Sequence, residues 1–199
     1  VEHHPSQIPS HLQLGAKDVA FLQNTVTLSV TAKQKSDHIE AIVAITNTNA
    51  GHHVPTDFPG RHLILTVSAT DNSGEMLSQL SGPMVPEWGG QQAGQPGTAF
   101  AKLLRDVVSG EWPVVSYWRQ SIIMADNRIP AMESHRSVYT FTTSPTAGPV
   151  EIRAELRLRR TFQDEIDPRA WDMSDIVMEE VQIKLVSEPR YERFLPIAH

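Results

Sequence analysis

The sequence contains no cysteine among its 199 residues. This absence excludes disulfide bonds, thiol catalysis, cysteine-type zinc sites and iron–sulfur clusters. It also excludes covalent attachment of a haem through a Cys-x-x-Cys-His motif. A metal bound by this chain would therefore need His, Asp, Glu, Met or backbone oxygen as its ligands. The nine histidines are many for a chain of this length, and they keep a metal site under consideration.

Several other signals are also missing. No apolar run reaches the roughly 20 residues that a membrane-spanning helix needs. No basic segment followed by an apolar stretch begins at Val1, so we expect that any signal peptide has been removed and that the protein is extracytoplasmic. The net charge of −6 argues against a nucleic-acid surface. Since the motifs of serine hydrolases, zinc peptidases and P-loop proteins are also missing, we do not expect an enzyme.

Most of the chain alternates apolar and polar residues with the period of two that marks a half-buried strand. In residues 150–159, apolar side chains alternate with Glu and Arg, which predicts one apolar face and one face with a ladder of pairing charges. The same alternation occurs in residues 26–30, 39–45, 63–69, 137–141 and 181–185. Such strands, joined by turns and long loops, predict a mainly β protein, a β-sandwich of immunoglobulin or fibronectin type.

Helical structure is expected only in short pieces. Residues 18–23 predict a short helix, and another helical turn is expected at residues 161–165. Residues 100–107 carry apolar side chains at spacings of three and four, which predicts a short helical insertion. Residues 82–97 are rich in Gly, Pro and Gln and are expected to form a long loop. The predicted organisation is an extended arm over residues 1–17 and a single sandwich domain over residues 18–199.

Residues 45–61 predict the end of a strand, an Asn-rich turn and a loop bracketed by Pro55 and Pro59, after which Arg61 opens the next strand. The same residues closely resemble the stretch N-x-x-A-G-H-x-x-P-T-G-x-P-x-R of a haem-free domain. That domain follows the haem-binding part in many bacterial multihaem c-type cytochromes. Asp57 stands where those relatives usually have Gly, so the loop must form here without the most permissive residue.

Four further stretches resemble the same domain in the same order. Residues 93–106 are similar to A-G-x-P-G-x-x-F-A-K-x-L-x-D, and residues 126–130 are similar to D-x-R-I-P. Residues 158–179 resemble its C-terminal part. Residues 10–18 resemble S-H-x-x-x-G-A-x-D, the peptide just after the last haem motif. The resemblance covers nearly the whole chain, and it is specific for the domain rather than for its chemistry.

The resemblance implies a role beside a haem. The histidine that corresponds to His11 looks like a distal haem ligand in those cytochromes. Because this chain has no haem motif, His11 either ligates the haem of a partner or is a solvated residue of the arm. The leading hypothesis is an exported, non-enzymatic module that docks to a multihaem c-type cytochrome or another redox protein. A purely structural cap of an electron-transfer assembly is a further alternative.

A second resemblance implies copper. The surface copper proteins of methanotrophic bacteria are similar to this domain and hold Cu(I) with two histidines and an oxidised tryptophan. That tryptophan and the first histidine fall near Ile64 and Thr66, so the usual signature is absent. His62 shares their strand parity, and His135 opens a later strand near the expected second ligand. If these strands are neighbours, His62 and His135 can converge on copper. Otherwise they are two unconnected histidines.

His52 matches the histidine of the family motif. His52 and His53 are adjacent, so in an extended loop their side chains point to opposite sides. The preferred interpretation of His52 is a hydrogen bond that holds the loop in place, and a metal ligand is the alternative.

Overall fold

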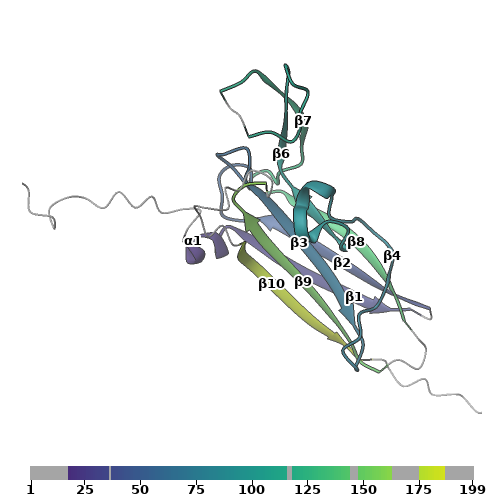
Figure 1. Cartoon of the computed structure of the whole chain (residues 1–199). Helices are drawn as coiled ribbons and strands as arrows, with labels where there is room; N and C mark the ends of the chain where they lie inside the picture. Colours follow the sequence, from purple (N-terminus) through teal and green to yellow (C-terminus); the bar gives the residue numbers. More distant parts are fainter. Residues whose placement is uncertain (1–17, 36, 116–117, 144–147, 163–174, 187–199) are drawn as a thin grey trace, which may run out of the picture.

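The computed structural model describes residues 18–35, 37–115, 118–143, 148–162 and 175–186. Two four-stranded antiparallel sheets form the body of the molecule and enclose the main hydrophobic core (Figure 1). The first sheet has the order β1 (Val26–Gln34), β2 (His38–Asn47), β8 (Ser134–Thr142) and β4 (Gln79–Ser81). The second has the order β10 (Ile176–Leu185), β9 (Val150–Arg159), β3 (His62–Thr70) and β5 (Gly97–Phe100). The predicted β-sandwich is confirmed.

The core follows from the alternation in the sequence. On β3, Leu63, Leu65, Val67 and Ala69 are fully or almost fully buried between the sheets. Ile39 on β2 and Phe141 on β8 meet them from the opposite sheet, as members of the same core. Removing these apolar surfaces from water supplies the main driving force for joining the two sheets.

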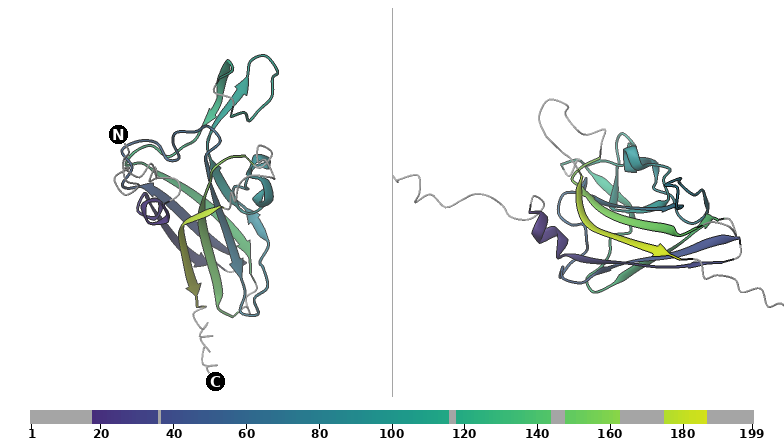
Figure 2. Two further views of the ribbon diagram at one scale, coloured as in Figure 1. Left: turned by 60° about the vertical axis from the view of Figure 1, so that its left-hand side comes forward. Right: turned by 90° about the horizontal axis from the view of Figure 1, so that it is seen from below.

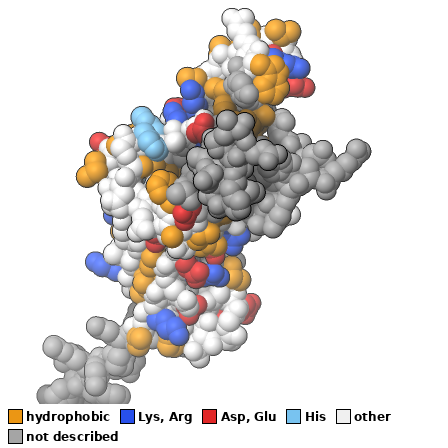
Figure 3. Space-filling view, turned by 90° about the vertical axis from the view of Figure 1, so that its left-hand side faces the viewer, with side chains coloured by type: hydrophobic (Ala, Val, Ile, Leu, Met, Phe, Trp, Pro, Cys, Tyr) orange, Lys and Arg blue, Asp and Glu red, His pale blue; other side chains and the backbone are white. Residues whose placement is uncertain are grey.

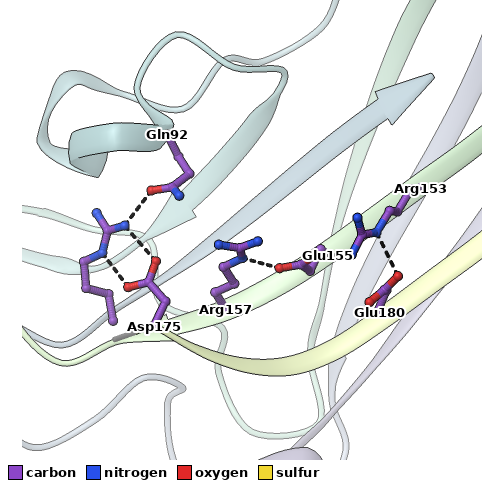
Figure 4. Close-up of polar contacts among 7 residues, drawn as sticks. Gln92, Arg153, Glu155, Arg157, Asp175 and Glu180 are labelled. Atoms are coloured by element: carbon purple, nitrogen blue, oxygen red, sulfur yellow. Dashed lines mark hydrogen bonds and ion pairs between the residues drawn. The ribbon is translucent and has the colours of Figure 1, made fainter. Parts of the chain in front are cut away.

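The ladder of charges predicted for residues 150–159 is present on the other face of β9. Arg153 donates to Glu180 of β10 at 2.8 Å and to Glu155 at 2.8 Å (Figure 4). Arg157 also donates to Glu155, which is buried and therefore needs both cations beside it (Figure 4). The ladder joins β9 to β10 along the sheet.

The helical prediction for residues 100–107 is wrong. This segment includes the end of β5 and then the strand β6 (Lys102–Asp106), which pairs with β7 (Ser121–Asp126) in a separate two-stranded ribbon. Leu103 and Leu104 are consecutive and both buried, so the strand shows no exposed face that would reveal a period of two. The ribbon stands apart from the two sheets in Figure 1 and in the left-hand view of Figure 2.

The helix predicted at residues 18–23 is confirmed as α1 (Val19–Gln23), and the side chain of Asp18 caps its first turn by accepting from Phe21 N at 3.1 Å. The long loop expected at residues 82–97 contains the 3₁₀ segment η2 (Glu87–Gln92). The arm predicted at residues 1–17 and most of the turn predicted at 161–165 lie outside the described residues. No helix in the described parts of the chain has both the length and the apolar character needed to cross a membrane.

Asn47 ties together two loops at one end of the sandwich. Its side chain is fully buried, and Nδ2 donates to the carbonyl oxygens of His52 at 2.8 Å and Ile129 at 3.1 Å. Its Oδ1 accepts from Ala50 N at 3.2 Å. A buried amide that satisfies three backbone groups fixes the chain path after β2, including the loop that resembles the cytochrome domain.

We expect Asn47→Ala to lower the free energy of unfolding by about 2 kcal/mol, because the carbonyl of His52 and the amide of Ala50 lose a side-chain partner, while the carbonyl of Ile129 keeps only its bond from Val54 N. Urea denaturation followed by circular dichroism measures this loss. The control is Asn49→Ala, because Asn49 is exposed and its side chain donates to Asn24 O alone among the described residues. This variant should lose less than about 1 kcal/mol. Equal losses in the two variants would contradict the role given to Asn47.

Candidate functional site

His62 is the first residue of β3 and its side chain leaves the sheet on the face opposite the main core. The adjacent Leu63 belongs to the core, whereas His62 packs between two rings outside it. Phe162 stacks on the imidazole at a centroid distance of 4.9 Å, and Trp88 of η2 meets it edge-on at 5.5 Å. We call His62, Trp88 and Phe162 the His62 cluster.

The hydrogen bonds of His62 fix its tautomer. Nδ1 lies 2.8 Å from the carbonyl oxygen of Gly60, so this nitrogen carries the proton and donates it. Nε2 is then an unprotonated lone pair, and it is buried with no hydrogen-bond partner among the described residues. Burial lowers the pKa of His62 to about 4, and the nearby charge of Arg159 contributes to this lowering. His62 is therefore neutral at physiological pH.

Arg159 lies beside this cluster and is itself buried. Its Nε and Nη2 donate to the two carboxylate oxygens of Asp175 at 2.8 Å each, and Nη1 donates to Gly89 O at 2.7 Å. Nη2 also donates to Gln92 Oε1 at 2.5 Å (Figure 4). Arg159 is only 4% exposed and lies opposite His62 in the register of β9 with β3. We call Arg159 and its three partners the Arg159 cluster; it joins β9, η2 and the residue before β10.

The sequence did not reveal the Arg159 cluster. Arg159 looked like one more cation of the exposed ladder, but its guanidinium is buried and its partners lie 16 and about 70 residues away. The one feature of the sequence that could have indicated a buried arginine is the position of Arg159 at the end of a strand rich in apolar residues. Since a buried guanidinium must be fully paired, that signal pointed to a partner without identifying it.

His135 lies in the other sheet. On β8 it pairs with Ile45, a residue of the main core, so its ring faces the interior of the sandwich. The ring meets Phe100 edge-on at a centroid distance of 4.8 Å, and burial lowers the pKa of His135. β3 and β8 are not neighbours, since they belong to different sheets. His62 and His135 therefore face different sides of the second sheet, and the structure does not bring them together.

The other candidate histidines are separate as well. His52 is exposed in the loop, with Nδ1 2.9 Å from the carbonyl oxygen of His53, while its own carbonyl accepts from Asn47. His11 lies outside the described residues. Within the described ranges, no group of three or more His, Asp or Glu side chains is arranged to hold a metal ion.

Asp57 adopts the conformation that favours glycine. Its φ is 73°, in the left-handed region, at the position where the resembling cytochrome domains usually have Gly. Its carboxylate pairs with Arg61 at 2.8 Å. Asp is among the residues that tolerate this region best, and the ion pair helps to hold the loop in its path without glycine.

A pocket of about 250 Å³ lies beside this loop, between it and α1. Buried Leu63, Leu158 and Met178 form its apolar floor, while Arg61 and His52 contribute cationic or polar groups at its rim. This end of the sandwich therefore offers a mainly apolar hollow, with Arg61 at its rim in an ion pair with Asp57. The face shown in Figure 3 carries basic, acidic and apolar side chains interspersed, without an extended patch of one charge.

We expect the stability of the protein to fall by about 2 kcal/mol between about pH 7.5 and pH 5 because of His62 alone. Its pKa is about 4 in the folded state against the ordinary value of 6.5, so the unfolded chain binds more protons between these limits. The stabilisation is complete above pH 6.5 and is lost as the pH falls towards 4. Urea denaturation at both pH values should show a flatter dependence in His62→Gln. His52→Gln, at an exposed histidine, should keep the wild-type dependence; an unchanged slope in His62→Gln would contradict this assignment.

No family model matches the chain, and no curated protein matches it. Among solved structures, the chain is similar to a penta-haem cytochrome c552 from Thermochromatium tepidum, with a TM-score of 0.65 and 22% sequence identity. The similarity covers 86% of this chain and 42% of that cytochrome, so this chain spans less than half of its length.

Two other structures match only loosely. A structural genomics target has a TM-score of 0.34 at 11% identity, and the match covers 88% of this chain and 94% of that one. An enzyme of macrocyclisation in alchivemycin A biosynthesis has a TM-score of 0.33 at 10% identity, with coverages of 85% and 93%. The cytochrome therefore provides the informative likeness: the sandwich of this chain has the fold of a portion of a multihaem cytochrome.

Proposed function

We propose that this chain is the haem-free, non-enzymatic module of an extracytoplasmic multihaem cytochrome system. In this role it docks on the haem-carrying polypeptide and positions or shields a haem. The observation that carries the proposal is the fold likeness to a penta-haem cytochrome over 86% of this chain. The five stretches that resemble haem-free cytochrome domains support it independently.

Because the chain has no cysteine, the proposed function requires that a haem be attached elsewhere. A c-type haem attached through two thioethers must belong to another chain or to a further part of the same chain. The described histidines give little support to copper binding as an alternative, because His62 and His135 face different sides of a sheet. The chain would then act through the placement of a partner's cofactor.

The end of the sandwich beside α1 is the best candidate for the docking surface. It combines the pocket, its cationic rim residue Arg61 and the exposed ring of Phe21. An apolar floor suits the edge of a haem, and a propionate could share the guanidinium of Arg61 with the exposed carboxylate of Asp57. The residues that precede α1 resemble the peptide that follows the last haem motif, so a haem-carrying part is expected at this end.

The first test is the affinity for a multihaem c-type cytochrome from the same organism. We expect Phe21→Asp to raise the dissociation constant at least about tenfold, since it places a charge on the apolar rim of the pocket. Isothermal titration calorimetry measures the change. The matched control is Met76→Asp, because Met76 is equally exposed and follows β3 at its other end. Equal affinities in the two variants would place the docking surface elsewhere, and no binding by the wild-type chain would leave only a structural role.

The second test concerns His11. If His11 ligates the partner's haem, His11→Ala should change the visible spectrum of the complex from that of a low-spin haem with two axial ligands to that of a haem lacking one. His4→Ala in the same arm is the control and should leave the spectrum unchanged. A spectrum of the complex that is identical for all three chains would exclude His11 as a ligand.

A further inference from the structure

The ribbon of β6 and β7 belongs to neither sheet of the sandwich, and the packing of the sandwich does not explain why it is there. It projects from the end of the two sheets, and its strands pair with each other rather than with either sheet (Figures 1 and 2). A two-stranded ribbon is marginally stable in water on its own. Such a projection therefore needs either internal packing or a partner.

The segment from β6 to β7 exposes much of its apolar surface. Of the large apolar side chains that are exposed in the described structure, a disproportionate share lies between residues 107 and 124. They are Val107, Val108, Trp112, Trp118, Ile122, Ile123 and Met124. Apolar side chains are also visible over the projecting lobe in Figure 3. An apolar concentration of this kind on a projecting element marks an interaction surface.

The two edges of the ribbon differ. The connecting segment covers the outer edge of β6, because Asp106 N donates to Glu111 O and Val114 N donates to Leu104 O, both at 3.0 Å. Across the described residues, β7 shows ladder pairing with β6 alone. Its run of residues 122–125, Ile-Ile-Met-Ala, contains no proline and no charged residue that would protect an edge strand. The outer edge of β7 is thus suited to pair with another strand.

We propose that the outer edge of β7 pairs with β7 of a second copy, in antiparallel orientation about a two-fold axis. The two ribbons then form one four-stranded sheet in the order β6–β7–β7–β6. In this antiparallel pairing, the apolar run of one copy lies opposite the same run of the second copy. No like-charged side chains within the run are therefore brought together. Main-chain hydrogen bonds supply affinity, and the apolar side chains on both faces gain cross-strand partners.

The charge distribution favours a second copy at this place. Residues 102–128 carry four cationic and three anionic side chains, a net charge of +1, so the rest of the chain carries −7 and the total is −6. The ribbon itself therefore carries none of the net negative charge of the chain, so charge repulsion between two copies that meet there is small. The acidic side chains at the ends of the two strands are already paired, Asp126 with Arg128 at 2.6 Å and Asp106 with Arg119 at 3.4 Å. These carboxylates therefore add little repulsion between the copies.

Sedimentation equilibrium of the full chain tests this directly. We expect a monomer–dimer equilibrium in the wild type, and we expect Ile123→Lys to raise the dimer dissociation constant at least about tenfold, because it places like charges near each other across the new pairing. Ile123 is 57% exposed, so the substitution should leave the sandwich folded. The control is Leu80→Lys, because Leu80 is also 57% exposed and lies on β4, an edge strand of the first sheet. It should dimerise like the wild type.

Three outcomes would overturn the proposal. The wild type could be monomeric at concentrations on the order of 100 µM, the upper end of the affinities expected for a weak interface. Ile123→Lys could dimerise as well as the wild type, or Leu80→Lys could weaken the dimer equally. Circular dichroism spectra of both variants should match the wild type. If Ile123→Lys does not fold, Met124→Thr tests the same edge with a smaller change, and full retention of its dimer would count against the proposal. None of these results depends on whether a haem partner binds.

Discussion

The guanidinium of Arg159 has lost nearly all contact with water, and the outer face of the second sheet is arranged around it. A buried cation is tolerated only when its donors are met, and here Asp175, Gln92 and Gly89 O meet them from two other parts of the chain. The 3₁₀ segment and the residue before β10 are thereby held at the end of β9, next to the first residue of β3. Removing one partner would leave the remaining charges imperfectly paired, so the effects of substitutions within the cluster should not be additive.

This arrangement decides what His62 can do. Its Nε2 has the lone pair that a metal or a proton requires, but Trp88 and Phe162 pack on the ring and Arg159 places a positive charge nearby. Cations of either kind are disfavoured there. The residue that looked most like a metal ligand in the sequence is thus held neutral among aromatic rings, and its clearest consequence is for stability at acidic pH.

The stretches that resemble cytochrome domains have physical reasons of their own. Asn47 satisfies three backbone groups. Gly97 lies so close to β3 that a Cβ atom would stand 2.1 Å from Leu65 O. Asp57 occupies a left-handed position by virtue of its side-chain type and its pairing with Arg61. These residues stabilise the fold. A resemblance in such motifs therefore predicts the β-sandwich, but it does not predict which chemistry the protein performs.

The strands could be predicted from the sequence because alternation is a local property, visible wherever one face is buried and the other is wet. Residues 100–107 gave a wrong helical prediction because Leu103 and Leu104 are both buried. The strand β6 therefore lacks the alternation of buried and exposed side chains. The pairing of His62 with His135 failed for another reason: strand parity gives a face, but only the order of strands in each sheet says which faces meet. The Arg159 cluster depends on contacts across about 70 residues, and no local pattern encodes them.

The two proposed surfaces would act together. If the chain acts as proposed, it would affect electron transfer through the distance and orientation of a partner's haem, and both would depend on how rigidly it holds that partner. The sandwich gives that rigidity, since the ladder on β9 and the Arg159 cluster join neighbouring elements across the second sheet. If the ribbons join two copies while the pocket end of each holds a haem-carrying part, the two-fold axis would set one fixed separation between the haems. The rate of electron transfer between the two copies would then depend on that separation.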